Sequence, residues 1–357
     1  MDRFKVAIFG AGKVGSALAA TLCLTGDIDV TIIDPSEEAL DAFAALGLPV
    51  KALRQRPNEK MPAEARGSDL IVAAAPDWAA SGIAELAGAS HAHFLDFSPA
   101  RPENLSLLQR LAETRLVLSG AGVAPGLVDN IASGLMEPGR TISDLTIRVG
   151  SLPRYPTNRL GYGQIWDIDA MIEEYTRACE AVQDGKAVFL KPLEHLEKVT
   201  LDGTVYECFT TARGLSDLTP YLEAGVRNVT FKTLRYPGHL DYMRFLLDDL
   251  GLKSRRDMLR SLLMNGLPVI DEDELLLFLT ARSTHRNRPA ERSLSLRFRS
   301  DRHQPFNAMT SVAAAYAASL IDLLRKGAFG ASGMVAHNRI ESEQLLENPF
   351  LKRLLVA

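Results

Sequence analysis

The sequence predicts an α/β protein, in which a Rossmann-type, doubly wound parallel sheet is followed by a second, mixed α+β domain. In the first part of the chain, short apolar and β-branched runs alternate with helical segments, which is typical of a parallel sheet. From about residue 143, strand-like runs instead follow one another with few helices between them. We therefore expect a Rossmann domain at 1–123, a mixed domain at 124–304, and a helical segment at 305–357 that returns to the Rossmann domain.

The opening segment predicts a turn that binds a dinucleotide. An apolar strand-like run leads into the turn GAGKVG, and an Ala- and Leu-rich helical segment follows. Gly10 allows a sharp turn, Gly12 lets the backbone approach a pyrophosphate, and Gly15 lets the helix pack closely on the sheet. Lys13 and Val14 lie where the helix begins, and the N–H groups at such a helix start face phosphates.

Asp34 ends the next apolar run and lies 19 residues after Gly15. From this position an acid accepts hydrogen bonds from a ribose hydroxyl. Its carboxylate would repel a 2′-phosphate, and Pro35, Ser36 and Glu37 supply no arginine that could hold one. We therefore expect NAD rather than NADP as the cofactor. The alternative is a glycine turn in a sheet that binds no nucleotide.

The alternation of strands and helices continues past Asp34. Small residues, Ala75 and Pro76, follow the fourth expected strand and leave room for a cofactor at its carboxyl end. Gly122, Val123 and Ala124 belong to a glycine-rich turn after the sixth, which either contacts the nicotinamide, serves as a hinge between the domains, or does both. We expect strands at 5–9, 30–33, 49–53, 69–74, 93–96 and 116–118, and helices at 14–24, 37–46, 78–87, 103–113 and 127–136.

The second domain is predicted from short runs with strand alternation. We expect an ordered loop at 153–163, an antiparallel pair formed by 275–281 and 294–298, and a buried apolar helix at 308–324. The basic residues between 282 and 303 lack interleaved aromatics, so they indicate a solvated strand face rather than a nucleic-acid site. The other expected strands are 145–149, 187–190, 198–201, 205–209 and 229–234, and the other helices are 168–176, 240–250 and 341–346.

Length, net charge and cysteine content limit the kinds of partner that we expect for this protein. The 357 residues suit two domains, and a net charge of −4 favours neither nucleic acid nor an anionic membrane as partner. We expect no signal peptide and no membrane span. Cys23, Cys179 and Cys208 are far apart, which predicts reduced thiols and a cytoplasmic protein. His91 and His93 have no further ligands nearby, so we expect no metal. A homodimer is the default for such a fold.

Several segments together resemble the saccharopine dehydrogenase family. They are the glycine fingerprint, GVAPGL at 122–127, EEYTRACEAVQDGK at 173–186, TARGLSDL at 211–218 and KTLRYPGH at 232–239. The resemblance covers most of the chain and implies NAD(P)-dependent oxidation of a C–N bond in lysine or a lysine-derived secondary amine. Ala124 stands where fungal saccharopine reductases carry aspartate, so the chain looks most similar to lysine 6-dehydrogenase-like members.

One motif departs from the family pattern. Where relatives often read TSGGLSTL, this chain reads TARGLSDL, which places Arg213 where glycine is usual. A guanidinium near the substrate could bind a second carboxylate and favour a diacid such as saccharopine. It could equally be a surface arginine. Three functions thus stay open: oxidation of lysine, oxidation of saccharopine, and NAD binding without turnover.

The implied chemistry removes a hydride from a carbon that bears a neutral amine, so a base is needed. His239 is the first candidate, because a helix start after Pro237-Gly238 should lower its pKa and keep it neutral, although it could simply pack in that turn. Asp96, at the end of the fifth strand, could hold an ammonium, tune a base or cap the next segment. The candidates for the substrate pocket are cationic or aromatic, and each could equally be structural: Arg213, Arg235, Arg148, Tyr162, Trp166 and Tyr175.

Overall fold

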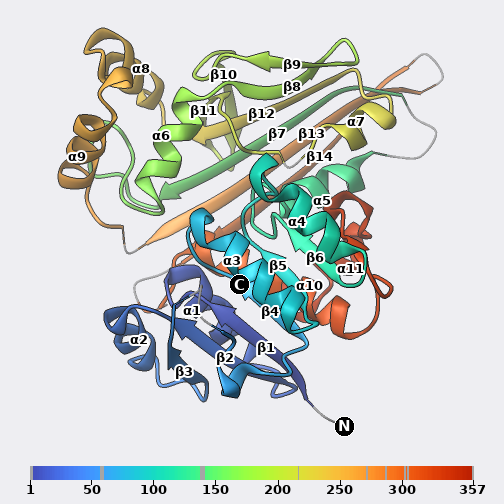
Figure 1. The fold of residues 1–357 in the computed structure, drawn as a ribbon. Helices are drawn as coiled ribbons and strands as arrows, with labels where there is room; N and C mark the ends of the chain where they lie inside the picture. Colours follow the sequence, from blue (N-terminus) through green and yellow to red (C-terminus); the bar gives the residue numbers. More distant parts are fainter. Residues whose placement is uncertain are drawn as a thin grey trace. The chain divides into compact units, whose positions relative to one another are not determined.

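The computed structural model describes residues 3–56, 60–136, 141–215, 217–270, 272–285, 288–300, 303 and 305–355. The chain forms two compact units (Figure 1). Unit 1 comprises Met1–Leu127 together with Thr310–Val356, and unit 2 comprises Val128–Met309. The expected fold class is confirmed, since one unit contains a parallel sheet and the other a mixed sheet.

The sheet of unit 1 has seven strands within the described residues, all parallel, in the order β15-β6-β5-β4-β1-β2-β3. The order changes direction between β1 and β4, and in open α/β sheets ligands bind at the carboxyl ends of the strands at such a switch point. Six of the strands were expected, and β15 was not. The strands are β1 (Phe4–Phe9), β2 (Ile28–Asp34), β3 (Lys51–Arg54), β4 (Leu70–Ala73), β5 (His93–Asp96), β6 (Leu116–Ser119) and β15 (Gly333–Met334).

Helices α3 (Asp77–Ala89) and α4 (Pro102–Ala112) lie side by side in unit 1 (Figure 1). Ile83 and Leu108 are completely buried there against Phe9 of β1, because the apolar residues of each helix recur at a spacing of three to four. The other helices that lie wholly or largely in this unit are α1 (Lys13–Leu22), α2 (Glu37–Ala44), η1 (Ala63–Ala65), α10 (Ala308–Arg325), η4 (His337–Arg339), α11 (Ser342–Leu346) and α12 (Pro349–Leu355).

The sheet of unit 2 has the order β10-β11-β12-β7-β13-β14, with β8 pairing with β12 and β9 with β8. β12 runs parallel to β7, and the other neighbours are antiparallel. The expected antiparallel pair is confirmed as β13 with β14, whereas β8 was missed. The strands are β7 (Thr141–Pro153), β8 (Cys179–Gln183), β9 (Lys186–Leu190), β10 (Glu197–Leu201), β11 (Thr204–Thr210), β12 (Asn228–Arg235), β13 (Asp273–His285) and β14 (Arg288–Arg299).

The two faces of this sheet carry different side chains. Leu234 of β12 belongs to an apolar cluster on one face, with Leu152 and Tyr206. Because successive side chains of a strand point to opposite faces, Arg235 points to the other face. Tyr162 and Tyr175 lie in a separate apolar cluster with residues of the unit's helices. Those helices are α5 (Leu127–Leu135), α6 (Ile168–Thr176), α7 (Thr219–Glu223), α8 (His239–Arg244), the π-helical turn η2 (Phe245–Asp249), η3 (Leu252–Ser254) and α9 (Arg256–Gly266).

The three cysteines are unpaired. Burial raises the pKa of Cys179 and of Cys208 to about 12, so both thiols are protonated and unreactive at neutral pH. Within the described part of the chain, no helix is long and apolar enough to cross a bilayer. Likewise, the residues described include no group of three or more metal-binding side chains.

Candidate nucleotide and substrate sites

The glycine turn after β1 is shaped by close backbone packing. Gly10 has a φ of +117°, and its N–H donates to the carbonyl oxygen of Ile33 over 2.8 Å. A Cβ added at Gly10 would lie 2.1 Å from the carbonyl oxygen of Ala74, and one added at Gly15 would lie 1.9 Å from that of Gly10. Both glycines are therefore needed for the turn and for the approach of α1 to the sheet.

Gly12 differs from its two neighbours, because a Cβ added there would meet no protein atom within 4 Å. Protein packing therefore does not require glycine at this position, whereas close approach of a pyrophosphate would. Lys13, which is exposed, and Val14, which is half-buried, begin α1 beside it. The residues of this turn thus fit a dinucleotide.

A cavity of about 350 Å³ lies at the carboxyl ends of β1, β2 and β4. It includes five of the residues that the sequence assigns to cofactor binding, namely Gly10, Gly12, Asp34, Ala75 and Pro76. These residues come from three separate strand ends, so the sheet brings together what the chain keeps apart. The cavity occupies the edge of the sheet at which a nucleotide is expected to bind.

Asp34 is held in this cavity by two backbone groups. Its Oδ2 accepts from the N–H of Ala11 over 2.7 Å, and its Oδ1 accepts from the N–H of Ser36 over 2.8 Å. Each carboxylate oxygen can accept a further hydrogen bond, which suits a ribose hydroxyl. The sequence analysis missed Arg54, which lies opposite Asp34 on the neighbouring strand, because β3 pairs with β2 in that register.

The glycine-rich turn after β6 contains Gly122, Val123 and Ala124. The carbonyl oxygen of Gly122 accepts from the N–H of Leu127 over 3.0 Å, and Val123 is buried. Gly126 has a φ of +116°, and an added Cβ there would lie 2.4 Å from the carbonyl oxygen of Gly120. The turn is therefore tight, and unit 1 ends directly after it at Leu127.

Asp96 ends β5 and is buried in unit 1. Its Oδ1 accepts from the N–H of Ser98 over 2.9 Å, which forms a local turn, whereas the N-cap residue of the following helix α4 is Arg101. Burial raises the pKa of Asp96 to about 7, and repulsion from Asp77 adds to this, while the bond from Ser98 opposes it. The structure places Asp96 and His239 in different units.

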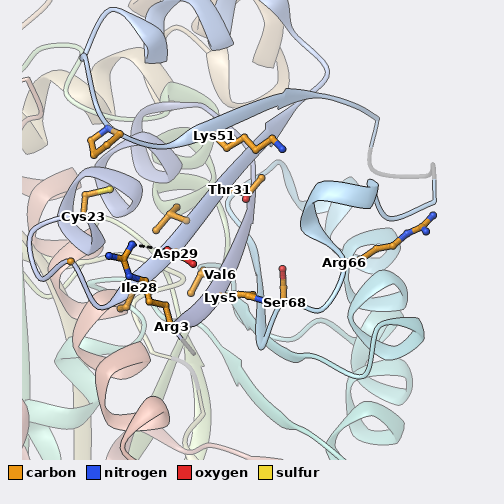
Figure 2. Close-up of a pocket in the computed structure, with 13 residues that line it drawn as sticks. Arg3, Lys5, Val6, Cys23, Ile28, Asp29, Thr31, Lys51, Arg66 and Ser68 are labelled. Atoms are coloured by element: carbon orange, nitrogen blue, oxygen red, sulfur yellow. Dashed lines mark hydrogen bonds and ion pairs between the residues drawn. The ribbon is translucent and has the colours of Figure 1, made fainter. Parts of the chain in front are cut away.

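A second cavity of unit 1, of about 420 Å³, lies where β1, β2 and β3 begin (Figure 2). Basic residues line it, but Arg3 is paired with Asp29 at 3.2 Å, and Arg66 points away from Lys5 in Figure 2. This cavity opens at the amino-terminal edge of the sheet, and it contains none of the predicted site residues.

In unit 2, three of the predicted residues form a buried hydrogen-bonded chain. The Nε of Arg235 lies 2.9 Å from Oη of Tyr175, which lies 3.0 Å from Nε2 of His239, and Nδ1 of His239 lies 2.8 Å from the carbonyl oxygen of Leu160. A carbonyl can only accept, so Nδ1 must be protonated and Nε2 must accept the tyrosine hydroxyl. Donation therefore runs from Arg235 to Tyr175, from Tyr175 to His239, and from His239 to the carbonyl oxygen of Leu160.

The imidazole of His239 is neutral within this series of hydrogen bonds. Burial lowers its pKa to about 3, and the positive charge of Arg235 lowers it further, whereas the bond to Leu160 opposes both. The neutral state was expected, but burial rather than the helix dipole is its main cause. The ring is fully buried and both nitrogens are bonded, so neither nitrogen is left to accept a proton directly from a substrate.

Two further predicted residues frame this chain. Nε1 of Trp166 donates to Oη of Tyr162 over 2.7 Å, and the guanidinium of Arg235 lies 4.7 Å from the centre of the Tyr162 ring. The same guanidinium lies 5.9 Å from the ring of Tyr175. These contacts are cation–π interactions that stabilise a buried positive charge. The structure thus brings together Trp166, Tyr162, Tyr175, Arg235 and His239.

Comparison with known families identifies the chain. Residues 6–119 match the family model described as saccharopine dehydrogenase NADP binding domain, and residues 122–355 match the one described as saccharopine dehydrogenase C-terminal domain. The chain belongs to the saccharopine dehydrogenase family. It is therefore an oxidoreductase with a nicotinamide-nucleotide domain, and the resemblance seen in the sequence motifs is confirmed at the level of the family.

Solved structures agree with this assignment. The fold is similar to that of apo saccharopine dehydrogenase (L-Glu forming) from Saccharomyces cerevisiae, with a TM-score of 0.80, 15% identity and 96% of each chain covered. A myo-inositol 2-dehydrogenase from Lactobacillus plantarum matches with a TM-score of 0.45, 11% identity and coverage of 99% and 95%. The first similarity shows a shared saccharopine dehydrogenase fold, and the second supports no further conclusion.

Glu174 is a titratable residue beside Arg235 that the sequence analysis missed. It precedes Tyr175 on α6, and burial raises the pKa of its carboxyl to about 7 against the attraction of Arg235 and Arg213. Helix periodicity could have found it, because Met171 is buried and Glu174 lies three residues later on the same side. Among the described residues, no ion pair joins Glu174 or Arg235 to any partner.

Arg213 and Arg148 lie apart from the buried chain. Arg213 has a φ of +67°, which explains why relatives often carry glycine there, and its guanidinium is paired with Glu173. Arg148 donates from Nε to Glu197 over 2.6 Å. Because Arg148 is the register partner of Lys232, it points to the face of the sheet opposite that of Arg235.

Proposed function

We propose that this member of the family is an NAD-dependent dehydrogenase that oxidises the C–N bond of L-lysine, as lysine 6-dehydrogenases do. The observation that carries the proposal is the burial of the Arg235 side chain, since this residue is only 2% exposed. A buried guanidinium without an ion-paired acid is costly, and the carboxylate of a bound substrate would offset that cost. The site is therefore suited to an anionic substrate group.

Glu174 extends the proposal to an amino acid. Its carboxyl is coupled electrostatically to Arg235 and Arg213, yet in the part of the chain that the structure describes it forms no ion pair with either, and Arg213 is paired with Glu173. L-Lysine carries an α-carboxylate for Arg235 and, at C6, the amine from which Glu174 would take a proton. We assign to Glu174 the role of base, because a pKa of about 7 lets a carboxylate accept a proton near neutral pH.

The proposed mechanism divides the work between the units. Asp34 binds a ribose hydroxyl, and Gly12 leaves room for the pyrophosphate. Nicotinamide, when bound, supplies the acceptor for a hydride. Glu174 takes a proton from the substrate ammonium, so that the neutral amine can lose hydride from its carbon, and water then hydrolyses the resulting imine. Tyr175, held between Arg235 and His239, fixes the guanidinium that orients the substrate.

The alternatives follow from what the substrate contributes. Saccharopine brings a further carboxylate, for which Arg213 was the candidate, but Glu173 already neutralises Arg213. We therefore favour lysine over saccharopine. A protein that binds NAD without turnover would need no base. A homodimer and a cytoplasmic location remain proposals, which analytical ultracentrifugation and localisation of the tagged chain can test.

The test compares two buried arginines of unit 2. Arg235→Lys keeps the charge but loses the fixed fork of donors, so KM for lysine should rise about tenfold or more. Arg148→Lys is the matched control, because Arg148 is also buried but points to the opposite face. Equal KM values for lysine in wild type and Arg235→Lys, measured at saturating NAD, would contradict the assignment.

A further inference from the structure

Next to two residues that line the nucleotide cavity, Asp34 and Gln55, the neighbouring strand carries an arginine. Arg54 is the register partner of Asp34 where β3 runs parallel to β2. Adjacent strands lie about 4.8 Å apart, so Arg54 leaves the sheet directly beside the acid that faces the ribose. From such a position a guanidinium can bind the 2′-phosphate that distinguishes NADP from NAD.

Arg54 is not free to do so in this structure. Its Nε donates to the carbonyl oxygen of Pro35 over 3.3 Å, and its Nη1 donates to Oε2 of Glu37 over 2.9 Å. Both contacts lie on the segment that joins β2 to α2, and Glu37 is the first residue of that helix. The guanidinium is thereby neutralised and directed along the rim.

We propose that Glu37 is a second determinant of NAD selectivity, acting by holding and neutralising Arg54. The inference rests on the proposed binding of a nicotinamide nucleotide in this cavity. Two carboxylates, Asp34 and Glu37, then lie at the two ends of the segment from β2 to α2, and the neighbouring cation is already paired. Discrimination of this kind depends on groups that disfavour the wrong ligand as well as on contacts with the right one.

The pair is weak enough for a single substitution to release Arg54. The side chains of Arg54 and Glu37 are 64% and 72% exposed, and exposed ion pairs of this kind hold their partners only loosely. Glu37→Gln keeps the size of the side chain and removes its charge. Arg54 can then turn to a 2′-phosphate and form the charge-assisted contact that phosphates make with arginine.

Equilibrium titration with NADP and with NAD tests the inference. In Glu37→Gln, Kd for NADP should fall about three- to fivefold, as release of an exposed ion pair allows, whereas Kd for NAD should stay within about twofold. Glu38→Gln is the matched control, because Glu38 is the next acid of the same helix turn but is not paired with Arg54. If Glu38→Gln improves NADP binding as much as Glu37→Gln, general charge removal explains the gain and the inference is overturned.

The same substitutions, combined with a change of Asp34, identify which residue causes any gain in NADP affinity. Because Asp34 itself repels the 2′-phosphate, the variants are also measured with Asp34→Ser, which brings NADP binding into range. In either background, adding Arg54→Gln should abolish the improvement that Glu37→Gln produces. A gain that survives Arg54→Gln, or no gain at all, contradicts the inference. Failure of wild type to bind either nucleotide would instead overturn the proposed function, and this inference with it.

Discussion

The hydroxyl oxygen of Tyr175 lies 3.0 Å from Nε2 of His239, and both side chains are buried. Since Nδ1 of His239 donates to Leu160, the tyrosine must donate to the histidine. His239 is therefore better suited to fixing Tyr175 and Arg235 than to removing a proton from a substrate directly. In the proposed site, His239 and Tyr175 therefore position Arg235, whereas Glu174 transfers the proton.

His239→Asn should lower kcat for lysine about tenfold or more while leaving Kd for NAD unchanged, because the tyrosine hydroxyl loses its acceptor and Arg235 its alignment. Steady-state rates and nucleotide titration measure the two effects. His337→Asn is a matched control, because its Nδ1 lies 2.7 Å from the hydroxyl of Tyr316 and its Nε2 lies 2.8 Å from the carbonyl of Ser119 in unit 1. A wild-type rate in His239→Asn across the pH range would remove His239 from the mechanism.

Glu174→Gln should abolish most turnover and remove a titration from the pH profile. The pKa of Glu174 is raised to about 7, so the base is protonated below that pH and available above it. In wild type, kcat/KM for lysine should therefore rise as pH increases through about 7. Glu173→Gln, which alters the neighbouring acid, should keep this rise. Persistence of the rise in Glu174→Gln would assign the titration to another group.

Two glycines of the same turn should respond differently to alanine. The Cβ added by Gly12→Ala would have no protein atom within 4 Å, so the thermal unfolding midpoint should be unchanged. The same Cβ would obstruct the pyrophosphate, so Kd for NAD should rise at least about tenfold. Gly15→Ala brings its Cβ to 1.9 Å from the carbonyl oxygen of Gly10, so it should lower both the midpoint and NAD affinity. If Gly12→Ala bound NAD as wild type does, no pyrophosphate would lie over the turn.

Arg213→Gly should change stability by no more than about 1 kcal/mol, because relief of the left-handed backbone at φ +67° offsets the lost pair with Glu173. Chemical denaturation measures this. The same variant separates the substrates: KM for lysine should stay near wild type. A selective rise of KM for saccharopine would show that Arg213 binds the additional carboxylate despite its partner.

The raised pKa of Asp96 predicts a pH dependence of stability. The pKa of Asp96 is about 7 in the folded state and 3.8 ordinarily. Between pH 3.8 and pH 7 the folded state therefore binds more protons than the unfolded state. The contribution of Asp96 is thus complete below pH 3.8 and is lost as pH rises through about 7, with an upper limit on the order of 4 kcal/mol. In the absence of nucleotide, the unfolding midpoint should fall less over this range in Asp96→Asn than in wild type. Parallel curves would contradict the prediction.

Local patterns predicted the Rossmann unit well. The glycine turn, Asp34 and five further strands follow from alternation and from residues that adopt special backbone conformations, and these signals lie within short stretches of chain. β15 was missed because its two residues, Gly333 and Met334, form a strand only by pairing with β6. Arg54 was missed for a similar reason, since only the register of β3 brings it beside Asp34.

The site of unit 2 was harder to predict because it depends on which face of a strand each residue occupies. Arg148 and Arg235 are equivalent in the sequence, yet the register of β7 with β12 separates them. Glu174 was overlooked because helix periodicity was not used to separate it from its neighbour Glu173, which is paired with Arg177, Arg213 and Arg256. Residue type identified candidates, and tertiary packing selected among them.

Lysine oxidation can be measured with the purified protein as the reduction of NAD in the presence of L-lysine. We expect the absorbance of reduced nicotinamide to increase with time at a rate that saturates with lysine concentration and is higher with lysine than with saccharopine. Absence of reduction with both compounds and with a wide panel of other amines, from a protein that binds NAD in equilibrium titration, would contradict the proposed function.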